Sequence, residues 1–314
     1  MTTLRQGVQE YLRMRRDLGF KLRDAGKGLL DFARFMEQHR ASYITQALAL
    51  VWAQQPLHAQ PAYWARRLSF VRGFAQHRSA TDPRTQIPAQ GLLPFRPKRA
   101  RPYLYSDAEI RGLLSAALKM PYHQERGKLR PWIYHCLLGL LSVSGLRVSE
   151  ARNLEVQDVD LKTALLTIRG TKFGKTRLVP LHHSTCQVLA EYIRRRNRHW
   201  RQRPVSPHLF VSSSGHRLDG ANIRRTFYAL SRQIGLRGPC DSHGPRLHDL
   251  RHRFATRILV RWYRSNQDPE RKLPLLSAYL GHAHVADTQW YLNGSPELMR
   301  EAMHRLEHRW EDRP

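Results

Sequence analysis

The sequence predicts a mainly α-helical protein, with an N-terminal helical bundle followed by a mostly helical domain that contains a small antiparallel β-sheet. Through most of the chain, apolar residues recur at spacings of three and four, which is typical of amphipathic helices. The period changes to an alternating one only across residues 156–181, which predicts short strands. Five prolines between residues 83 and 102 interrupt the helical pattern and separate the two parts.

The composition indicates a folded protein that binds a polyanion. Hydrophobic residues make up 41% of the 314 residues, so the chain is neither disordered nor fibrous. Lys and Arg number 53 against 25 Asp and Glu, a net charge of +28. Nucleic acid is the first candidate partner, because neutralising its phosphates releases condensed counterions. A protein that only needs a soluble surface does not require so large an excess of positive charge.

The cysteines and the apolar runs indicate the cellular compartment. Cys136, Cys186 and Cys240 are widely spaced and form no CxxC pair, so neither a disulfide framework nor a zinc module is indicated. Arginines interrupt the N-terminus, and no apolar run approaches membrane-spanning length. We therefore expect a cytoplasmic, nucleoid-associated protein with no membrane contact, metal or cofactor.

Residues 1–78 predict four short amphipathic helices that form a small bundle, a candidate DNA-binding domain. Arg66 and Arg67 could face a phosphate backbone, although a solvated basic face explains either residue nearly as well. Residues 79–105 then predict an extended basic linker, since proline disfavours helix and strand interiors. Its Arg96, Lys98, Arg99 and Arg101 suit a segment that lies along DNA, but a plain connector remains an alternative.

The second domain, residues 106–314, opens with a capping box of Ser106 and Glu109 ahead of an apolar helical stripe. A strongly apolar helix follows over 132–143 and ends at Gly145, which can adopt the left-handed cap conformation. Arg147 then lies at the start of another helix. Because helix N-termini bind phosphate, this position favours a ligand contact over a structural charge.

Residues 165–168 and 178–181 predict two strands of a β-hairpin with a basic tip. Lys172 or Lys175 could reach outward from this tip as a phosphate contact or a proton donor, and a solubilising role would suffice if the hairpin stood alone. Ser184 is expected to cap the next helix, and residues 222–234 form another.

A helix that begins near residue 247 places His248, Arg251 and His252 on one face. A guanidinium binds phosphate through two hydrogen bonds, and imidazole exchanges protons near neutral pH. The His248–His252 spacing also fits a zinc helix, but the charge of Arg251 opposes a dication and no third ligand is evident. Buried polar histidines and a solvated arginine remain alternatives for this stretch alone.

The C-terminal region predicts a polar loop over 265–272 and a short helix over 273–281 that glycine ends. His282 therefore lies just beyond a helix end, and Tyr291 follows nine residues later. A last helix, 295–312, has Ser295 as its N-cap and carries an apolar stripe that includes Met299 and Met303. Its own domain or a neighbouring subunit could cover this stripe.

Taken together, these motifs resemble the tyrosine recombinase, or phage integrase, family over residues 106–295. The matching text is Ser144-Gly145-Leu146-Arg147-Val148-Ser149-Glu150, Arg177-Leu178-Val179-Pro180-Leu181 after the hairpin tip, Leu247-His248-Asp249-Leu250-Arg251-His252, Leu280-Gly281-His282 and Tyr291. Several spaced motifs in the right order are more specific than any one of them. The resemblance implies a helical core-binding domain, a linker and a catalytic domain that close around double-stranded DNA as a clamp.

The resemblance also implies roles for the residues. Tyr291 would attack a DNA phosphate to give a 3′-phosphotyrosyl link, with Arg147 and Arg251 on the non-bridging oxygens. His248 would be the base, His282 would donate to the phosphate, and Lys172, or Lys175 as its substitute, would protonate the leaving oxygen. His252 and Glu150 would support and orient these residues.

The implied function is site-specific recombination through a Holliday junction in a homotetramer, serving integration, excision, transposition or resolution of a mobile element. One alternative is a type IB topoisomerase, which shares the chemistry but rejoins the original strand. The compact N-terminal bundle and the helix after Tyr291 oppose that alternative. Another is a non-catalytic DNA-binding relative, which the intact set of catalytic residue types opposes.

Overall fold

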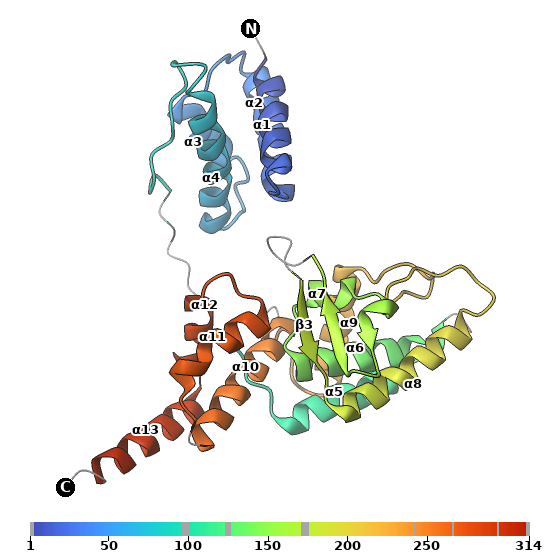
Figure 1. Cartoon of the computed structure of the whole chain (residues 1–314). Helices are drawn as coiled ribbons and strands as arrows, with labels where there is room; N and C mark the ends of the chain where they lie inside the picture. The colour runs from blue at the N-terminus through green and yellow to red at the C-terminus, as the bar shows by residue number, and fades with distance from the viewer. Residues whose placement is uncertain are drawn as a thin grey trace. The chain divides into compact units, whose positions relative to one another are not determined.

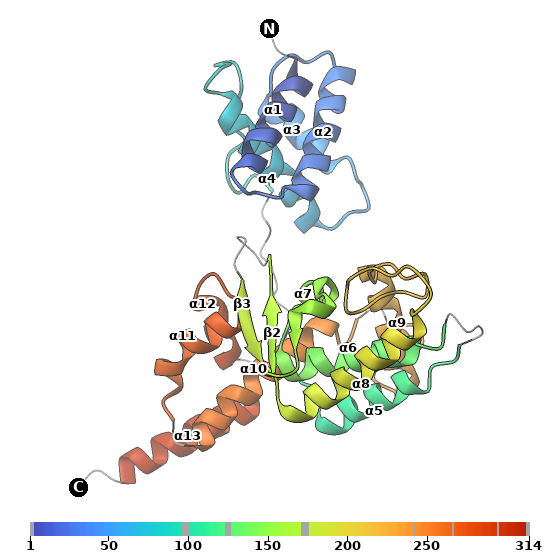
Figure 2. The same ribbon diagram turned by 45° about the vertical axis from the view of Figure 1, so that its right-hand side comes forward.

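The chain divides into two compact units, Met1–Ala100 and Arg101–Pro314. The computed structural model describes residues 3–93, 95, 101–122, 127–170, 176–241, 243–265, 267–293 and 295–311. Helices dominate both units, and one small antiparallel sheet lies in the second (Figures 1 and 2). The predicted mainly helical fold with a small sheet is confirmed. Among the described residues, no helix is long and apolar enough to cross a membrane.

The first unit is a bundle of four helices, as predicted: α1 (Leu4–Asp17), α2 (Arg23–Gln38), α3 (Gln46–Gln54) and α4 (Pro61–Arg78). Thr3 and Gln6 form a capping box at the start of α1, Thr45 caps α3, and Pro61 occupies the first position of α4. Apolar side chains from all four helices form one core. Its members include Val8, Leu12, Leu29, Phe32, Met36, Trp52, Val71 and Phe74.

The chain does not leave this unit at residue 79, where the linker was expected to begin. The backbone N–H of Gln86 donates to the carbonyl of Ile44, and Arg72 donates to the carbonyls of Pro88 and Ala89. Leu92 also packs against the bundle core. The first part of the proline-containing segment therefore belongs to the bundle, because its carbonyls supply acceptors that α4 needs.

The second unit contains the sheet and the remaining helices. The sheet has the order β1-β2-β3 with antiparallel neighbours, and Leu166 pairs with Val179 in its register. The predicted hairpin is thus joined by a third, two-residue strand. The elements are α5 (Asp107–Leu118), α6 (Arg130–Ser144), α7 (Val148–Asn153), η2 (Val156–Asp158), β1 (Val159–Asp160), β2 (Leu165–Ile168), β3 (Arg177–Pro180), α8 (His183–His199), α9 (Gly220–Gln233), α10 (Leu247–Arg264), α11 (Pro269–Leu280), α12 (Ala286–Gln289), η4 (Trp290–Asn293) and α13 (Pro296–Glu311).

Helix α10 connects two hydrophobic cores of this unit. Leu250, near its start, belongs to the large core that also contains α5, α6, α8 and α9. Ala255 and Leu259, further along, belong to a smaller core with α11, η4 and α13. The first turns of α10 consequently lie between the two hydrophobic cores. This packing restricts the side chains on their polar face.

Several boundaries differ from the prediction for local reasons. Residues 265–272 are not all loop, because Asp268 caps α11 and Pro269 occupies its first position. His182 rather than Ser184 caps α8, and Asp219 caps α9, which begins at Gly220, two residues before the predicted start. The capping box of Ser106 and Glu109 is present as predicted.

Candidate active site

The first two turns of α10 supply three of the predicted site residues. Asp249 accepts hydrogen bonds from the backbone and guanidinium of Arg246, which fixes the start of this helix. His248 and His252 lie one turn apart with ring centroids 4.8 Å from each other. Arg251 projects between α6 and α11 and is only 1% exposed. The predicted shared face of these residues is therefore present.

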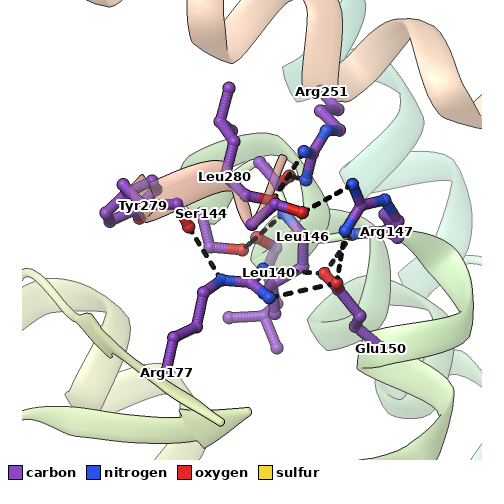
Figure 3. A network of polar contacts seen from close by, with 11 residues as sticks. Leu140, Ser144, Leu146, Arg147, Glu150, Arg177, Arg251, Tyr279 and Leu280 are labelled. Atoms are coloured by element: carbon purple, nitrogen blue, oxygen red, sulfur yellow. Dashed lines mark hydrogen bonds and ion pairs between the residues drawn. The ribbon is translucent and has the colours of Figure 1, made fainter. Parts of the chain in front are cut away.

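Backbone carbonyls hold the guanidinium of Arg251 in place. Its Nη1 donates to the carbonyl of Gly145 over 2.7 Å, and its Nη2 donates to the carbonyl of Leu280 over 2.7 Å (Figure 3). Gly145 ends α6 in the left-handed conformation, with φ +61°, and a Cβ there would lie 2.4 Å from the ring of Phe254. Burial lowers the pKa of Arg251, and the hydroxyl of Tyr291 acts to raise it. The hydroxyl of Tyr291 and the guanidinium of Arg251 therefore interact electrostatically.

Arg147 is the N-cap residue of α7, so its predicted position at the start of a helix is confirmed. Its Nη1 donates to Glu150 Oε1 over 2.8 Å, and its Nη2 donates to the carbonyl of Gly281 over 3.0 Å. Its backbone N–H also donates to Glu150. The side chain is therefore directed across to the C-terminal end of α11, close to Arg251 (Figure 3).

A further arginine, Arg177 on β3, completes this network. Its Nη1 and Nη2 donate to the two carboxylate oxygens of Glu150, over 3.1 and 2.8 Å, and its Nε donates to the carbonyl of Tyr279 over 2.8 Å. The carbonyls of Tyr279, Leu280 and Gly281 thus each accept from a different arginine. They form the C-terminal end of α11, where orphan carbonyls and the helix dipole favour cations.

Glu150 links two of these arginines while it is buried. Burial acts to raise its pKa, but hydrogen bonds from Arg177 and Arg147 outweigh burial, so the pKa of Glu150 is lowered. The carboxylate is therefore charged at neutral pH. A charged acceptor with two guanidinium donors makes strong hydrogen bonds, which fixes the position of Arg147.

The segment after α11 places the side chains of His282 and Tyr291 next to each other. Nδ1 of His282 lies 2.7 Å from the hydroxyl of Thr288, and its ring stacks with that of Tyr291 at 6.0 Å between centroids. Tyr291 lies in η4 and is 4% exposed. Its ring also contacts His252 edge-on, 5.2 Å between centroids, and Trp290. A histidine and a tyrosine of one chain thus share the site with both arginines.

The histidines are uncharged at neutral pH. Desolvation, with the charges of Arg251 and Arg147, lowers the pKa of His282 to about 4. Desolvation and His248 lower the pKa of His252 to about 3. Desolvation and Arg251 also lower the pKa of His248. Burial and the charge of Arg251 thus keep His248 neutral, and a neutral imidazole can accept a proton.

Comparisons with known proteins decide the family. A family model described as the phage integrase family matches residues 109–297. The chain belongs to this family, the tyrosine recombinases. Integrase/recombinase y4rB of Sinorhizobium fredii is 67% identical over 313 residues, which cover all of both chains. Tyrosine recombinase XerC of Chlamydia pneumoniae is 27% identical over 87% of this chain and 78% of its own.

Solved structures of recombinases share the fold. The Tn1549 transposon integrase, in complex with transposon right-end DNA, matches with a TM-score of 0.67 at 17% identity, covering 98% of this chain and 100% of that one. XerH site-specific recombinase, bound to a palindromic difH substrate, matches with a TM-score of 0.63 at 19% identity over 89% and 78% of the two chains. As a member of the family, the chain is a site-specific recombinase.

The structure brings together most of the recombinase residues that the sequence predicted. Arg147, Glu150, His248, Arg251, His252, His282 and Tyr291 lie around the C-terminal end of α11. Lys172 and Lys175 lie outside the described residues, as do Arg96, Lys98 and Arg99. Arg101 is exposed.

The two arginines proposed for α4 have different environments. Arg66 is exposed and pairs with Asp24 over 2.5 Å. The prediction that Arg67 faces DNA is wrong in this structure, because Arg67 is buried, donates to the carbonyl of Trp52 and lies 3.8 Å from the centre of its ring. A cation on an aromatic face is a stable arrangement without any phosphate.

Arg177 is the site residue that sequence reasoning missed. It was part of the quoted motif text but received no role, because an arginine at the start of a strand has no distinctive local signal. Its partners Glu150 and Tyr279 lie 27 and 102 positions away in the chain. Only the tertiary structure reveals these contacts.

Proposed function

We propose that the chain cleaves and rejoins DNA through a 3′-phosphotyrosyl intermediate. The observation that carries the proposal is the cluster of Arg147, Arg251, His248, His282 and Tyr291 around the end of α11. The two guanidinium groups supply fixed positive charge, and the histidines supply neutral proton acceptors or donors. Tyr291 supplies the hydroxyl nucleophile beside them. This combination suits transfer of a phosphoryl group without a metal ion.

In the proposed cleavage step, the hydroxyl oxygen of Tyr291 attacks a phosphorus atom of the DNA backbone. His248 takes the phenol proton, and a bond forms between phosphorus and the tyrosine oxygen. The bond from phosphorus to the 5′ oxygen breaks, and Lys172 protonates that oxygen. Arg147, Arg251 and His282 donate to the non-bridging oxygens, where negative charge accumulates in the transition state. The reverse of this step on a second strand rejoins the DNA.

Tyr291 packs against His282 and His252 of its own chain, which supports a nucleophile that acts in cis. Its burial means that bound DNA must open a path to the hydroxyl, and catalytic contacts often tighten only in the complex. The net charge of +28 supports binding of double-stranded DNA. The exposed Arg66 and Arg101 are candidates for backbone contacts, with Lys175, Arg96, Lys98 and Arg99.

We further propose that the chain acts in a homotetramer on the sites of a mobile element. The 67% identity to a protein named as an integrase/recombinase supports this role, as does the shared fold with a transposon integrase. On α13, Leu298 is buried whereas Met299 and Met303 are exposed. Those methionines could dock onto a neighbouring subunit, which is the proposed use of this helix.

The test uses duplexes that the protein enriches from a randomised pool by binding, each then nicked near its centre. We expect a denaturation-resistant adduct in buffer with chelator, and no adduct with Tyr291→Phe, which retains the ring packing. Specific binding by the unsubstituted chain without any adduct would contradict the proposed chemistry. Exchange of strands between two duplexes of different length separates a recombinase from a topoisomerase, which rejoins only the original strand.

A further inference from the structure

Arg177 on β3 contacts the site but is not one of the proposed phosphate ligands. We propose that Arg177 is a positioning residue that fixes Arg147 and the turn of His282 for phosphate binding. The inference rests on the proposed function of those two residues. It concerns a side chain to which the sequence motif gave no role, and it assigns the sheet a part in positioning the site.

The contacts of Arg177 use every nitrogen of its guanidinium. Nη1 and Nη2 bind Glu150 through a two-pronged ion pair, and Nε donates to the carbonyl of Tyr279 (Figure 3). The side chain is 12% exposed and that of Glu150 is 7% exposed. Arg177 therefore holds two protein groups, the carboxylate of Glu150 and the C-terminal end of α11.

Glu150 carries the influence of Arg177 to Arg147. The carboxylate is shared, since Oε1 accepts from Nη1 of Arg147 over 2.8 Å and from Nη1 of Arg177 over 3.1 Å. Loss of Arg177 would leave a buried carboxylate with one guanidinium partner. We expect Glu150 to draw Arg147 toward itself or to admit water, and either change displaces Arg147 from the carbonyl of Gly281.

Gly281 carries the influence of Arg177 to His282. Gly281 has φ +68°, and a Cβ built on it would lie 2.8 Å from Nη1 of Arg177. The guanidinium thus lies over the bare backbone of the residue that directly precedes His282. It also binds the carbonyl of Tyr279, two positions before Gly281. Arg177 therefore contacts two backbone positions of the segment that leads into His282.

The experiment compares Arg177→Met and Arg177→Lys with the unsubstituted chain. Arg169→Met is a matched control, because Arg169 also lies at one end of a strand of the sheet and pairs with a buried carboxylate, Asp158, outside the site. The readouts are single-turnover adduct formation on the nicked duplex, affinity for the same duplex, and thermal unfolding. A second substrate carries a 5′-bridging phosphorothiolate, whose sulfur leaves without a proton donor.

We expect Arg177→Met to slow adduct formation about 100-fold, the scale of a catalytic group displaced by about 1 Å. Duplex affinity should change by less than about twofold, because the loss is confined to the reacting state. Arg177→Lys should recover little activity, since an ammonium cannot replace a two-pronged guanidinium. The slowing should persist on the phosphorothiolate, and Arg169→Met should react like the unsubstituted chain.

Two results would overturn the inference alone. One is an Arg177→Met variant that forms adduct at the unsubstituted rate. The other is a slow variant that recovers fully on the phosphorothiolate, because Arg177 would then act on protonation of the leaving oxygen. Absence of adduct with the unsubstituted chain would instead overturn the proposed function and this inference with it. The two failures are therefore distinguishable.

Discussion

At the scale of single residues, the site gathers positively charged guanidinium groups around backbone carbonyls and one carboxylate. Three arginines bind consecutive carbonyls at the end of α11, and one carboxylate, Glu150, joins two of them. This arrangement fixes the guanidinium groups before a phosphate arrives, so little reorganisation is needed during reaction. Burial, together with the charges of the site, lowers the pKa values of the neighbouring histidines, and this has a consequence for stability.

We predict that the protein loses stability as the pH falls from about 6.5 toward 4. His252 and His282 have pKa values of about 3 and about 4 in the folded chain, against 6.5 as the ordinary value. Between these limits the unfolded chain binds more protons, so the free energy of unfolding rises with pH. The stabilisation from these two histidines is complete above pH 6.5. Burial of His252 alone makes the free energy of unfolding change by up to about 1.4 kcal/mol per pH unit.

Urea unfolding at several pH values checks this expectation. His252→Gln and His282→Gln should each flatten the pH dependence between pH 4.5 and 6.5. His58→Gln is the control, because His58 is exposed in the first unit, and it should leave the slope unchanged. A double variant whose stability falls as steeply as that of the unsubstituted chain would contradict the assignment of the slope to these two histidines.

Sequence reasoning reached the site residues that lie in motifs. Arg147 follows a glycine cap, and His248 and Arg251 share a helix face, so local spacing identified them. It could not reach Arg177, whose partners lie far away in the chain. It also assigned Arg67 to DNA, because a sequence does not reveal that Trp52 lies beneath this guanidinium.

At the scale of elements, the first segment of the second unit is attached to α10. Nε of Arg253 donates to the carbonyl of Tyr105 over 2.7 Å, and its Nη2 pairs with Asp107. The hydroxyl of Tyr105 donates to the carbonyl of Arg246, just before the same helix. The helix that carries His248 and Arg251 is therefore held by Tyr105, just before α5, and by Asp107, the first residue of α5.

We predict that Arg253→Met destabilises the second unit by about 1–3 kcal/mol, because the buried carbonyl of Tyr105 loses its donor. Arg257→Met is the matched control, since Arg257 pairs with the same Asp107 but its side chain is 59% exposed, against 9% for Arg253. An exposed pair contributes about 0–1 kcal/mol. Chemical denaturation measures both variants, and equal losses would contradict a special role for Arg253.

Element types were more predictable than element boundaries. The apolar stripes identified the helices of the first unit, and alternation identified β2 and β3. The start of α11 was missed because Glu270, Arg271 and Lys272 in its first turn are charged, although Asp268 and Pro269 form a recognisable start signal. The strand β1 was missed because two residues are too short for a pattern.

At the scale of the whole molecule, composition and comparison agree on a nucleic-acid partner. The excess of 28 positive charges favours a polyanion, and the family consists of recombinases. Composition could not specify the reaction, because many basic proteins bind DNA without cleaving it. The reaction is inferred from five side chains that approach one another across separate elements.

The most direct test of this claim is to identify the two atoms joined in the trapped adduct. Protease digestion followed by mass spectrometry of the DNA-linked peptide locates the modified residue, and end-labelling of the DNA locates the phosphate. The account predicts one modified residue, Tyr291, linked to a 3′ phosphate, with a free 5′ hydroxyl on the released strand. Linkage through another residue, or to a 5′ phosphate, would contradict it.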